Sequence, residues 1–289
     1  MTPALAAPGV GLGSDTLIAL RGLALAGTQS QTLAALPGGY ATRRKGQGLE
    51  LADVRDYVAG DDVRSLDLGA TARTGRLHVR QFREERDKVS LLVADFRPSM
   101  LWGLQRAFRS VAAAEALVML GWQIVEAGGR VGLLAVTSNQ PVVMPARGRV
   151  RGMLDVIGGM VEAHDQALAQ TRDEDPTLEQ ALVHADRLVP AGAELLIASG
   201  FDVLGAGFAD RLDALASRRT PRLLLVTDGQ SLPKGRYPVR LVDGRFARLR
   251  IGGQEAPRRW QEIAGRDALV LDAGEQIEQM ARRISAMAV

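Results

Sequence analysis

Asp95 and Ser99 have the types and spacing of residues that bind a metal ion. They follow a short apolar run at residues 89–94 and precede an apolar helical stretch, so a carboxylate and a hydroxyl can converge beside a helix start. Mg²⁺ prefers about six oxygen ligands, several of them water, and Thr177, at the start of a later predicted helix, offers a third protein oxygen. The structural alternative is that Asp95 and Ser99 cap the following helix. From spacing alone the cap is the favoured interpretation.

Three carboxylates at predicted strand ends define a second chemistry. Asp95, Asp202 and Asp228 each lie in the polar loop after a predicted buried strand. If at least two of them converge on one ion, the pattern fits metal-assisted hydrolysis, which also needs a general base with a perturbed pKa. Asp228 follows a strand expected to lie farther from the first strand, and no histidine is nearby. Both features count against this alternative.

The elements that position these residues are short apolar runs separated by helical stretches. Strands buried on both faces are predicted at residues 89–94, 131–136, 194–198, 222–226 and 268–271. Helices are predicted at about residues 104–127, 147–163, 176–188, 207–217, 256–264 and 274–286. This alternation predicts an α/β fold, a doubly wound and mostly parallel sheet. Its functional crevice is expected at the carboxyl ends of the strands, where the strand order reverses.

Two hairpins and an N-terminal extension complete the prediction. Residues 141–144 are expected to run back beside 131–136, and Asp243-Gly244 is a hairpin signal between two further strands at 238–242 and 246–251. In the extension, we expect a helix at 14–35, structured loop at 46–76 and a half-buried strand at 77–82. The predicted domains are a flexible tail (1–13), an N-terminal helix with a loop-rich and β extension (14–87) and the α/β domain (88–289).

Composition and charge exclude several classes of function. The 289 residues include no cysteine and three histidines, which removes thiolate sites and argues against a multi-histidine metal site. The 36 basic and 33 acidic residues give a net charge of only +3, which is unlike nucleic-acid-binding proteins. No segment fits membrane insertion, and no Lys or Arg precedes Arg21 as in a signal peptide. We therefore expect a cytoplasmic protein.

Acidic and basic residues interleave between residues 53 and 76. Because arginine binds carboxylates bidentately, this alternation predicts a segment held together by ion pairs rather than by a large apolar core. The alternative is a charged recognition surface with Arg55, Tyr57 and Arg64 as contacts, since Arg and Tyr are frequent at binding hot spots. Trp102, beside the loop that carries Ser99, either covers the crevice or lines a partner groove.

Residues 46–87 resemble the signature of a bacterial family of unknown function, DUF 58, whose members are found beside MoxR-type AAA+ ATPases. The positions that match the signature are Gly46, Gly48, Glu50, Arg55, Tyr57, Gly60, Asp61, Arg64, Asp67, Ala72, Arg73 and Glu85. Leu51, Ala59 and Leu68 depart from it, where the family has Phe, a frequent Pro and Trp. The resemblance covers about residues 40–230 and implies a MoxR-type AAA+ ATPase as the partner.

The α/β part resembles von Willebrand factor A domains. In that family Asp-x-Ser-x-Ser, a later Thr and an Asp after the fourth strand hold Mg²⁺, which bridges to an acidic residue of a partner. Asp95, Ser99 and Thr177 match this metal-ion-dependent adhesion site. Arg97 replaces its first Ser and Gly200 its distal Asp, so the site is degenerate. Arginine has donors only and cannot ligate a cation.

We predict that the Arg97 guanidinium lies near the metal position, pairs with Asp95 and presents a positive charge to an acidic partner group. Asp202 is the candidate replacement for the missing carboxylate. The resemblances imply a non-enzymatic interaction module, an adaptor or target of a MoxR-type AAA+ ATPase in protein-complex assembly or maturation. The crevice residues expected to contact the partner are Asp95, Arg97, Ser99, Trp102 and Asp202. No cofactor is expected apart from Mg²⁺ at the degenerate site.

Overall fold

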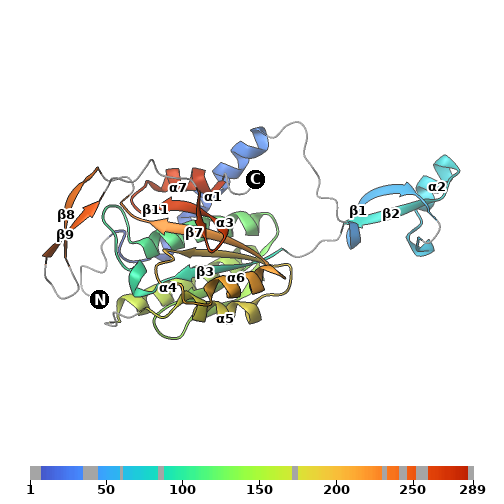
Figure 1. The fold of residues 1–289 in the computed structure, drawn as a ribbon. Helices are drawn as coiled ribbons and strands as arrows, with labels where there is room; N and C mark the ends of the chain where they lie inside the picture. The colour runs from blue at the N-terminus through green and yellow to red at the C-terminus, as the bar shows by residue number, and fades with distance from the viewer. Residues whose placement is uncertain are drawn as a thin grey trace. The chain divides into compact units, whose positions relative to one another are not determined.

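The chain divides into two compact units, residues 1–33 with 88–289 and residues 34–87 (Figure 1). The computed structural model describes residues 8–34, 45–58, 61–83, 88–170, 175–229, 233–240, 246–251 and 260–285. Helix α1 (Ser14–Ala34) belongs with the larger, α/β unit. The prediction that grouped this helix with the segment up to residue 87 is therefore wrong.

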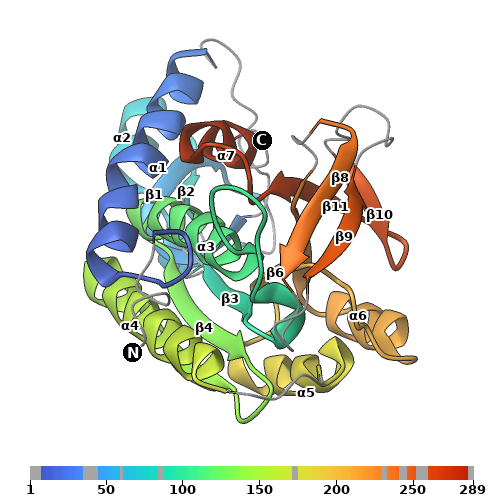
Figure 2. The same cartoon turned by 90° about the vertical axis from the view of Figure 1, so that its left-hand side faces the viewer.

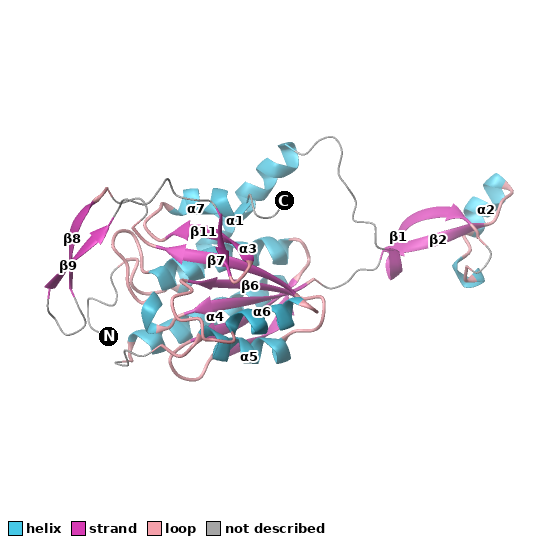
Figure 3. Cartoon of the chain, in the orientation of Figure 1, coloured by secondary structure: helices cyan, strands magenta, loops and turns pink. Residues whose placement is uncertain are grey.

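A seven-stranded sheet forms the centre of the larger unit (Figure 3). Its strand order is β10-β11-β7-β6-β3-β4-β5. The parallel strands are β3 (Val89–Asp95), β4 (Arg130–Val136), β6 (Glu194–Ser199), β7 (Thr220–Thr227) and β11 (Arg266–Asp272). The antiparallel edge strands are β5 (Val142–Gly148) and β10 (Trp260–Ile263). The mostly parallel α/β sheet and its five buried strands are as the sequence predicts.

Helices cover both faces of this sheet (Figure 2). Leu92 and Ala94 of β3 join the core beneath one set of helices, whereas Leu91 and Val93 join the core beneath the other. The first set is α3 (Arg109–Glu126), α4 (Arg149–Leu168) and α7 (Ile277–Ser285), and the second is α5 (Leu178–Leu188) and α6 (Phe208–Ala216). Because both faces are buried, the strands are continuously apolar. None of the described helices is long and apolar enough to cross a membrane.

Helix α1 packs against α3 through its apolar face. Leu17 and Ala24 are buried in the core that contains α3, and Gln123 Nε2 donates to the Ala24 carbonyl at 3.1 Å. The Arg21 guanidinium lies 5.4 Å from the centre of the Trp122 ring, a cation–π distance. These contacts explain why α1 belongs to the α/β unit.

Part of the predicted flexible tail is ordered. The Phe108 amide donates to the Gly9 carbonyl at 2.7 Å, and Leu12 is buried in the core. Gly9 has φ +80°, and a side chain there would collide with the backbone at Arg106. The tail prediction is therefore wrong from Gly9 to Leu12, and residues 1–7 lie outside the described residues.

Of three hairpins in the described part of the larger unit, two are as the sequence predicts and one replaces part of a predicted helix. The predicted helix at 256–264 is wrong at residues 260–263, which form β10 and lead into β11 through a turn with positive φ at Ala264 and Gly265. That turn geometry suits a tight hairpin. Residues 256–259 lie outside the described residues. The other hairpins are confirmed, β5 against β4 and β8 (Gly235–Arg240) against β9 (Phe246–Ile251). The turn at 243–244 lies outside the described residues.

The smaller unit is a β-hairpin with two short helical turns. Strands β1 (Lys45–Asp56) and β2 (His78–Arg83) pair antiparallel, and the 3-10 turn η2 (Val63–Ser65) and helix α2 (Leu68–Thr74) connect them. Asp62 caps η2, and Asp67 caps α2 by accepting from the Ala70 amide at 2.8 Å. The predicted loop at 46–76 is wrong for β1, whose charged sequence lacks apolar alternation.

A buried histidine joins α3 to α4 in the larger unit. His164 is fully buried, its Nε2 lies 2.9 Å from Ser110 Oγ, and its ring meets Phe96 edge-on with centroids 5.1 Å apart. Burial lowers the pKa of His164 to about 4, because the imidazolium would lose its hydration. His164 therefore belongs to the core between α3 and α4.

We expect this histidine to make the fold sensitive to acid. In the unfolded chain His164 becomes protonated below about pH 6.5, whereas in the folded chain it stays neutral down to about pH 4. The free energy of unfolding should therefore fall by about 3 kcal/mol across that window. Urea unfolding between pH 7 and pH 4 measures it, and His164→Gln, which keeps a partner for Ser110 without titrating, should remove that part of the loss. His184→Gln, at an exposed position, is the matched control. Equal pH profiles for all three proteins would contradict the expectation.

Candidate functional site

The strand order of the sheet reverses at β3. Strand β4 lies on one side of β3, and β6 followed by β7 lies on the other. In open α/β sheets, ligands bind outside the carboxyl ends of the strands at such a point. The last residues of β3 and β6 and the loops after them carry Asp95, Arg97, Ser99, Ser199, Gly200 and Asp202. We call these residues, with Trp102, Arg109 and Thr177, the switch-point site.

Arg97 and Asp95 form a buried, two-pronged ion pair. Arg97 Nε donates to Asp95 Oδ1 at 2.9 Å and Nη2 to Oδ2 at 2.8 Å. The Arg97 backbone N–H also donates to Oδ1, at 3.1 Å. The exposed fraction is 0% for Arg97 and 1% for Asp95. The predicted pairing of the two residues is confirmed, in the bidentate form that gives strong charge-assisted hydrogen bonds.

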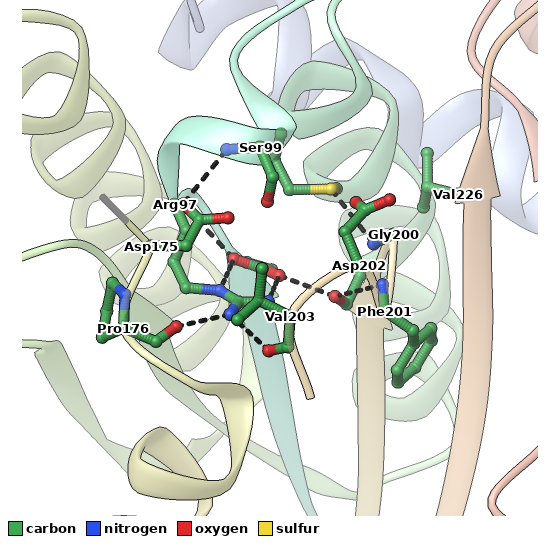
Figure 4. Close-up of polar contacts among 12 residues, drawn as sticks. Arg97, Ser99, Asp175, Pro176, Gly200, Phe201, Asp202, Val203 and Val226 are labelled. Carbon is green, nitrogen blue, oxygen red and sulfur yellow. Dashed lines mark hydrogen bonds and ion pairs between the residues drawn. The ribbon is translucent and has the colours of Figure 1, made fainter. Parts of the chain in front are cut away.

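The third guanidinium nitrogen of Arg97 donates hydrogen bonds to two further loops and so connects them to the end of β3 (Figure 4). Its Nη1 donates to the Pro176 carbonyl at 2.6 Å, before α5, and to the Val203 carbonyl at 2.9 Å, after β6. Burial alone would lower the pKa of Arg97, but hydrogen bonds with Asp95 and the charges of neighbouring carboxylates raise it, so the guanidinium stays charged. A group enclosed in this way cannot touch a partner. The structure therefore corrects the prediction that Arg97 presents its charge to an acidic partner group.

The other side of Asp95 is closed by Ser199. Ser199 Oγ donates to Asp95 Oδ2 at 2.6 Å and accepts from the Phe201 amide at 2.9 Å. Both carboxylate oxygens thus already have donors, and one of those donors is a cation. The arrangement does not fit Mg²⁺, and no group of three or more His, Cys, Asp or Glu side chains among the described residues is placed to hold a metal.

Ser99 and Thr177 do not converge on Asp95 as metal ligands. The Ser99 amide donates to Asp175 Oδ1 at 3.1 Å, while its Oγ is buried without a hydrogen-bond partner in the described part of the chain. Thr177 precedes α5 and lines a pocket of about 150 Å³ whose wall contains neither Asp95 nor Ser99. The alternative that Asp95 and Ser99 cap a helix also fails, because α3 begins only at Arg109.

Arg109 is a candidate site residue that sequence reasoning missed. Its side chain is buried, Nε donates to the Val226 carbonyl at 2.9 Å, and Nη1 forms an ion pair with Asp202 Oδ2 at 2.9 Å. The guanidinium also lies 5.3 Å from the centre of the Trp102 ring. One signal was visible, since an arginine at the start of an apolar helix needs partners. A second cation therefore occupies the switch-point site.

Gly200 leaves the space that Arg109 fills. A Cβ at this position would overlap the Arg109 guanidinium and approach the Asp202 carboxylate. The next residue, Phe201, has φ +53°, a left-handed conformation that is uncommon for a non-glycine residue. The loop after β6 is therefore shaped around Arg109. The absence of an acidic side chain at 200 has a packing reason.

The third predicted carboxylate, Asp228, lies at the end of β7. Its Oδ2 accepts from the Leu104 amide, and its Oδ1 is buried without a hydrogen-bond partner in the described part of the chain. Burial raises the pKa of Asp228. Asp95 and Asp202 are already paired with arginines, so the three carboxylates do not share an ion site. Nothing in the described residues indicates enzymatic activity.

The accessible part of the switch-point site is therefore small. The Trp102 side chain is 38% exposed and the Asp202 side chain 44% exposed. Both contact the buried Arg109, Trp102 through its ring and Asp202 through its carboxylate. Of the contact residues predicted for the crevice, these two are exposed and Ser99 is half-buried, whereas Asp95 and Arg97 are enclosed.

In the smaller unit, the predicted ion pairing is confirmed at Arg55. Its Nη1 and Nη2 each donate to an oxygen of Asp61 at 2.6 Å. Hydrogen bonds from Arg55 and from the Val58 amide hold the pKa of Asp61 at about 2. Arg55 is thus used within the unit, Tyr57 is half-buried, and Arg64 is exposed.

Removing Arg97 should destabilise the α/β unit strongly. Arg97→Ala leaves Asp95 buried without its cation, which costs about 3–5 kcal/mol in the free energy of unfolding. Arg97→Lys should recover only part of this, since an ammonium group cannot replace the fork. Arg147→Ala is the control, because Arg147 pairs with Asp155 at the surface and should lose at most about 1 kcal/mol. Similar losses from Arg97→Ala and Arg147→Ala in urea unfolding would refute the role given to the buried pair.

Filling the space at Gly200 should break the contacts of Arg109. Gly200→Ala should lower the free energy of unfolding by about 1–3 kcal/mol, as overpacking does. Gly158→Ala, in α4 with open space around it, should be neutral or stabilising by up to about 1 kcal/mol. In an Arg109→Ala background the cost of Gly200→Ala should largely disappear, which a double-mutant cycle measures. Additive effects would show that Gly200 is needed for another reason.

Comparisons with known proteins find relatives that match part of the chain. Uncharacterized proteins of Mycobacterium bovis and of two strains of Mycobacterium tuberculosis are each 36% identical to this chain over 105 residues. The match covers 35% of this chain and 32% of each relative, so the chain spans about a third of the length of the curated relatives it matches.

Among solved structures, the crystal structure of the conserved hypothetical protein BatB from Bacteroides thetaiotaomicron is similar with a TM-score of 0.42 and 13% identity. That match covers 70% of this chain and 98% of the BatB chain. The profile of the family described as protein of unknown function DUF58 matches residues 53–245, about two thirds of the chain. The chain therefore belongs to the DUF58 family, whose function is unknown.

Proposed function

We propose that the chain is a non-enzymatic protein-interaction module that binds a partner at the switch-point site. The partner class is a MoxR-type AAA+ ATPase, for which the chain acts as adaptor or target during assembly or maturation of a protein complex in the cytoplasm. The proposal for the partner rests on the resemblance of residues 46–87 to the DUF 58 signature. The proposal for the site, which revises its contact residues, rests on Arg109.

The observation that supports this function is that two buried arginines pair with the carboxylates that would otherwise hold a metal or act in catalysis. Arg97 neutralises Asp95 and fixes the loops around it, and Arg109 neutralises Asp202. Fixed loops with an exposed tryptophan over an arginine resemble a binding hot spot, where Trp and Arg are over-represented. Because Asp95 and Asp202 are both paired with arginines, neither is free to act as a base in the described site.

Arg109, rather than Arg97, is the cation that an acidic partner group can reach. Its Nε is held by the Val226 carbonyl, so the guanidinium stays in place if Asp202 swings away. Asp202 is partly exposed, and such ion pairs contribute little to stability. A partner carboxylate can therefore exchange with Asp202 at low cost. Trp102 would then cover the new contact.

We expect Trp102→Ala to weaken binding to a purified MoxR-type AAA+ ATPase from the same organism about tenfold or more. Trp260→Ala is the matched control, since Trp260 is 40% exposed on edge strand β10 and should leave the affinity unchanged. Asp202→Asn should retain or increase the affinity, because it removes the competing charge. Biolayer interferometry without nucleotide, in Mg²⁺ or EDTA, measures all three.

EDTA should leave the affinity unchanged, because Arg109 supplies the positive charge that a metal supplies elsewhere. Equal affinities for Trp102→Ala and Trp260→Ala would reject the switch-point site as the contact. Failure of the wild-type chain to bind the ATPase would reject the partner. Binding that requires Mg²⁺ and is lost in Asp95→Ala would overturn the metal-free contact.

A further inference from the structure

We propose that the outer face of helix α4 pairs with the same face of a second copy of the chain, with the two helices antiparallel. Figure 2 shows α4 at the outside of the α/β unit. The proposal does not depend on the function proposed for the switch-point site. Three observations carry it: an exposed aliphatic stripe, a glycine that no contact inside the chain requires, and a charge pattern that an antiparallel copy complements.

The stripe on the outer face of α4 is continuous because its residues follow one another at helical spacing. Side chains three or four positions apart are neighbours on a helix, and the stripe consists of Val150, Leu154, Gly158 and Val161. Val150 and Leu154 are each 42% exposed, and Val161 is half-buried. The opposite face of α4 is buried in the core through Met153, Val156, Ile157 and Met160. The fold therefore leaves two aliphatic side chains, one helical turn apart, exposed on the outer face.

Gly158 lies in the middle of the stripe, where no described contact requires a glycine. A Cβ at Gly158 would meet no described atom within 4 Å, whereas a Cβ at Gly159 would meet side-chain atoms of Met144 and Leu133 at 2.8 and 2.9 Å. Glycine inside a helix is destabilising relative to alanine, and close approach of another backbone is one condition that favours it. The distance between packed helices depends on the side chains at their contact. Gly158 thus allows a second helix to come close at the centre of the stripe.

The charges along α4 run opposite to those that stabilise a single helix. The helix macrodipole favours acidic residues in the first turn and basic residues in the last turn, and α4 has neither. Its acidic and basic residues are, in chain order, Arg149, Arg151, Asp155, Glu162 and Asp165. Asp155 pairs with Arg147 at 2.8 Å, whereas Arg151 and Asp165 are exposed and form no ion pair with a described residue. The helix alone therefore does not explain a basic start and an acidic end.

An antiparallel second copy accounts for all three observations. Gly158 is seven positions, or about two helical turns, from both Arg151 and Asp165. A two-fold axis near Gly158 therefore brings Arg151 of one copy opposite Asp165 of the other, and the same contact occurs twice. Leu154 then packs against Gly158 and Val161 of the second copy. A parallel pair would place like charges opposite one another, and the acidic end would repel nucleic acid or an anionic membrane.

Sedimentation velocity of the full-length chain, at concentrations from about 1 to 300 µM, measures this association. We expect the wild type to approach twice the mass of one chain within this range. Leu154→Lys, Arg151→Glu and Asp165→Arg should each weaken the dimer at least tenfold, because each acts at both symmetric contacts. All three positions are exposed, so circular dichroism should report unchanged folding.

A mixture of the two charge variants tests the antiparallel arrangement. Arg151→Glu alone places acidic residues opposite one another, and Asp165→Arg alone places basic residues opposite one another. In the mixture each copy supplies the charge that the other needs, so a heterodimer should form with close to wild-type affinity. Arg187→Glu on α5 and Asp210→Arg on α6, also at exposed positions, are the matched controls and should dimerise as the wild type does. So should Trp102→Ala, which separates this face from the switch-point site.

A wild-type chain that remains monomeric over the whole range would overturn the proposal. Association that persists unchanged in Leu154→Lys would place the contact on another surface and overturn it as well. Charge variants that stay monomeric when mixed would contradict the antiparallel arrangement.

Discussion

The loops at the carboxyl ends of the central strands depend on the buried ion pair between Asp95 and Arg97. Removing two charges from water is expensive, and the cost is offset only when the remaining donors and acceptors are also satisfied. Here Ser199 completes the carboxylate, and the carbonyls of Pro176 and Val203 complete the guanidinium. The loops before α5 and after β6 must therefore keep one conformation. The hydrogen bonds of this buried ion pair therefore fix the shape of the surface above the carboxyl end of β3.

Arg109 is a second buried cation at the carboxyl ends of the strands, and its surroundings differ from those of Arg97. Arg97 donates its hydrogen bonds to Asp95 and to two backbone carbonyls, whereas Arg109 forms an ion pair with a partly exposed carboxylate, that of Asp202. The two guanidinium groups differ in what surrounds them, since Arg97 is enclosed by backbone carbonyls and Arg109 lies beneath Trp102 and Asp202. The inner pair holds the loops in place, whereas the outer pair is the one that the proposed partner would reach.

The sequence predicted features that depend on local pattern and missed those that depend on distant contacts. Continuous apolar runs predicted the parallel strands, because burial on both faces leaves no alternation. The pairing of Arg97 with Asp95 was predictable because the two residues are only two positions apart in the sequence. The contact of Arg109 with Asp202 joins residues 93 positions apart, which no local pattern shows. Strand β10 was missed because Ala264 adopts positive φ, a conformation that few non-glycine residues adopt.

The smaller unit divides the DUF 58 signature into two kinds of residue. Arg55, Asp61 and Asp67 are needed to hold the hairpin, its turn and its helix together, through an ion pair and a cap. Arg64 and Arg73 match the same signature but make no ion pair with a described residue. Internal stability therefore accounts for the first group and leaves the second without a structural reason.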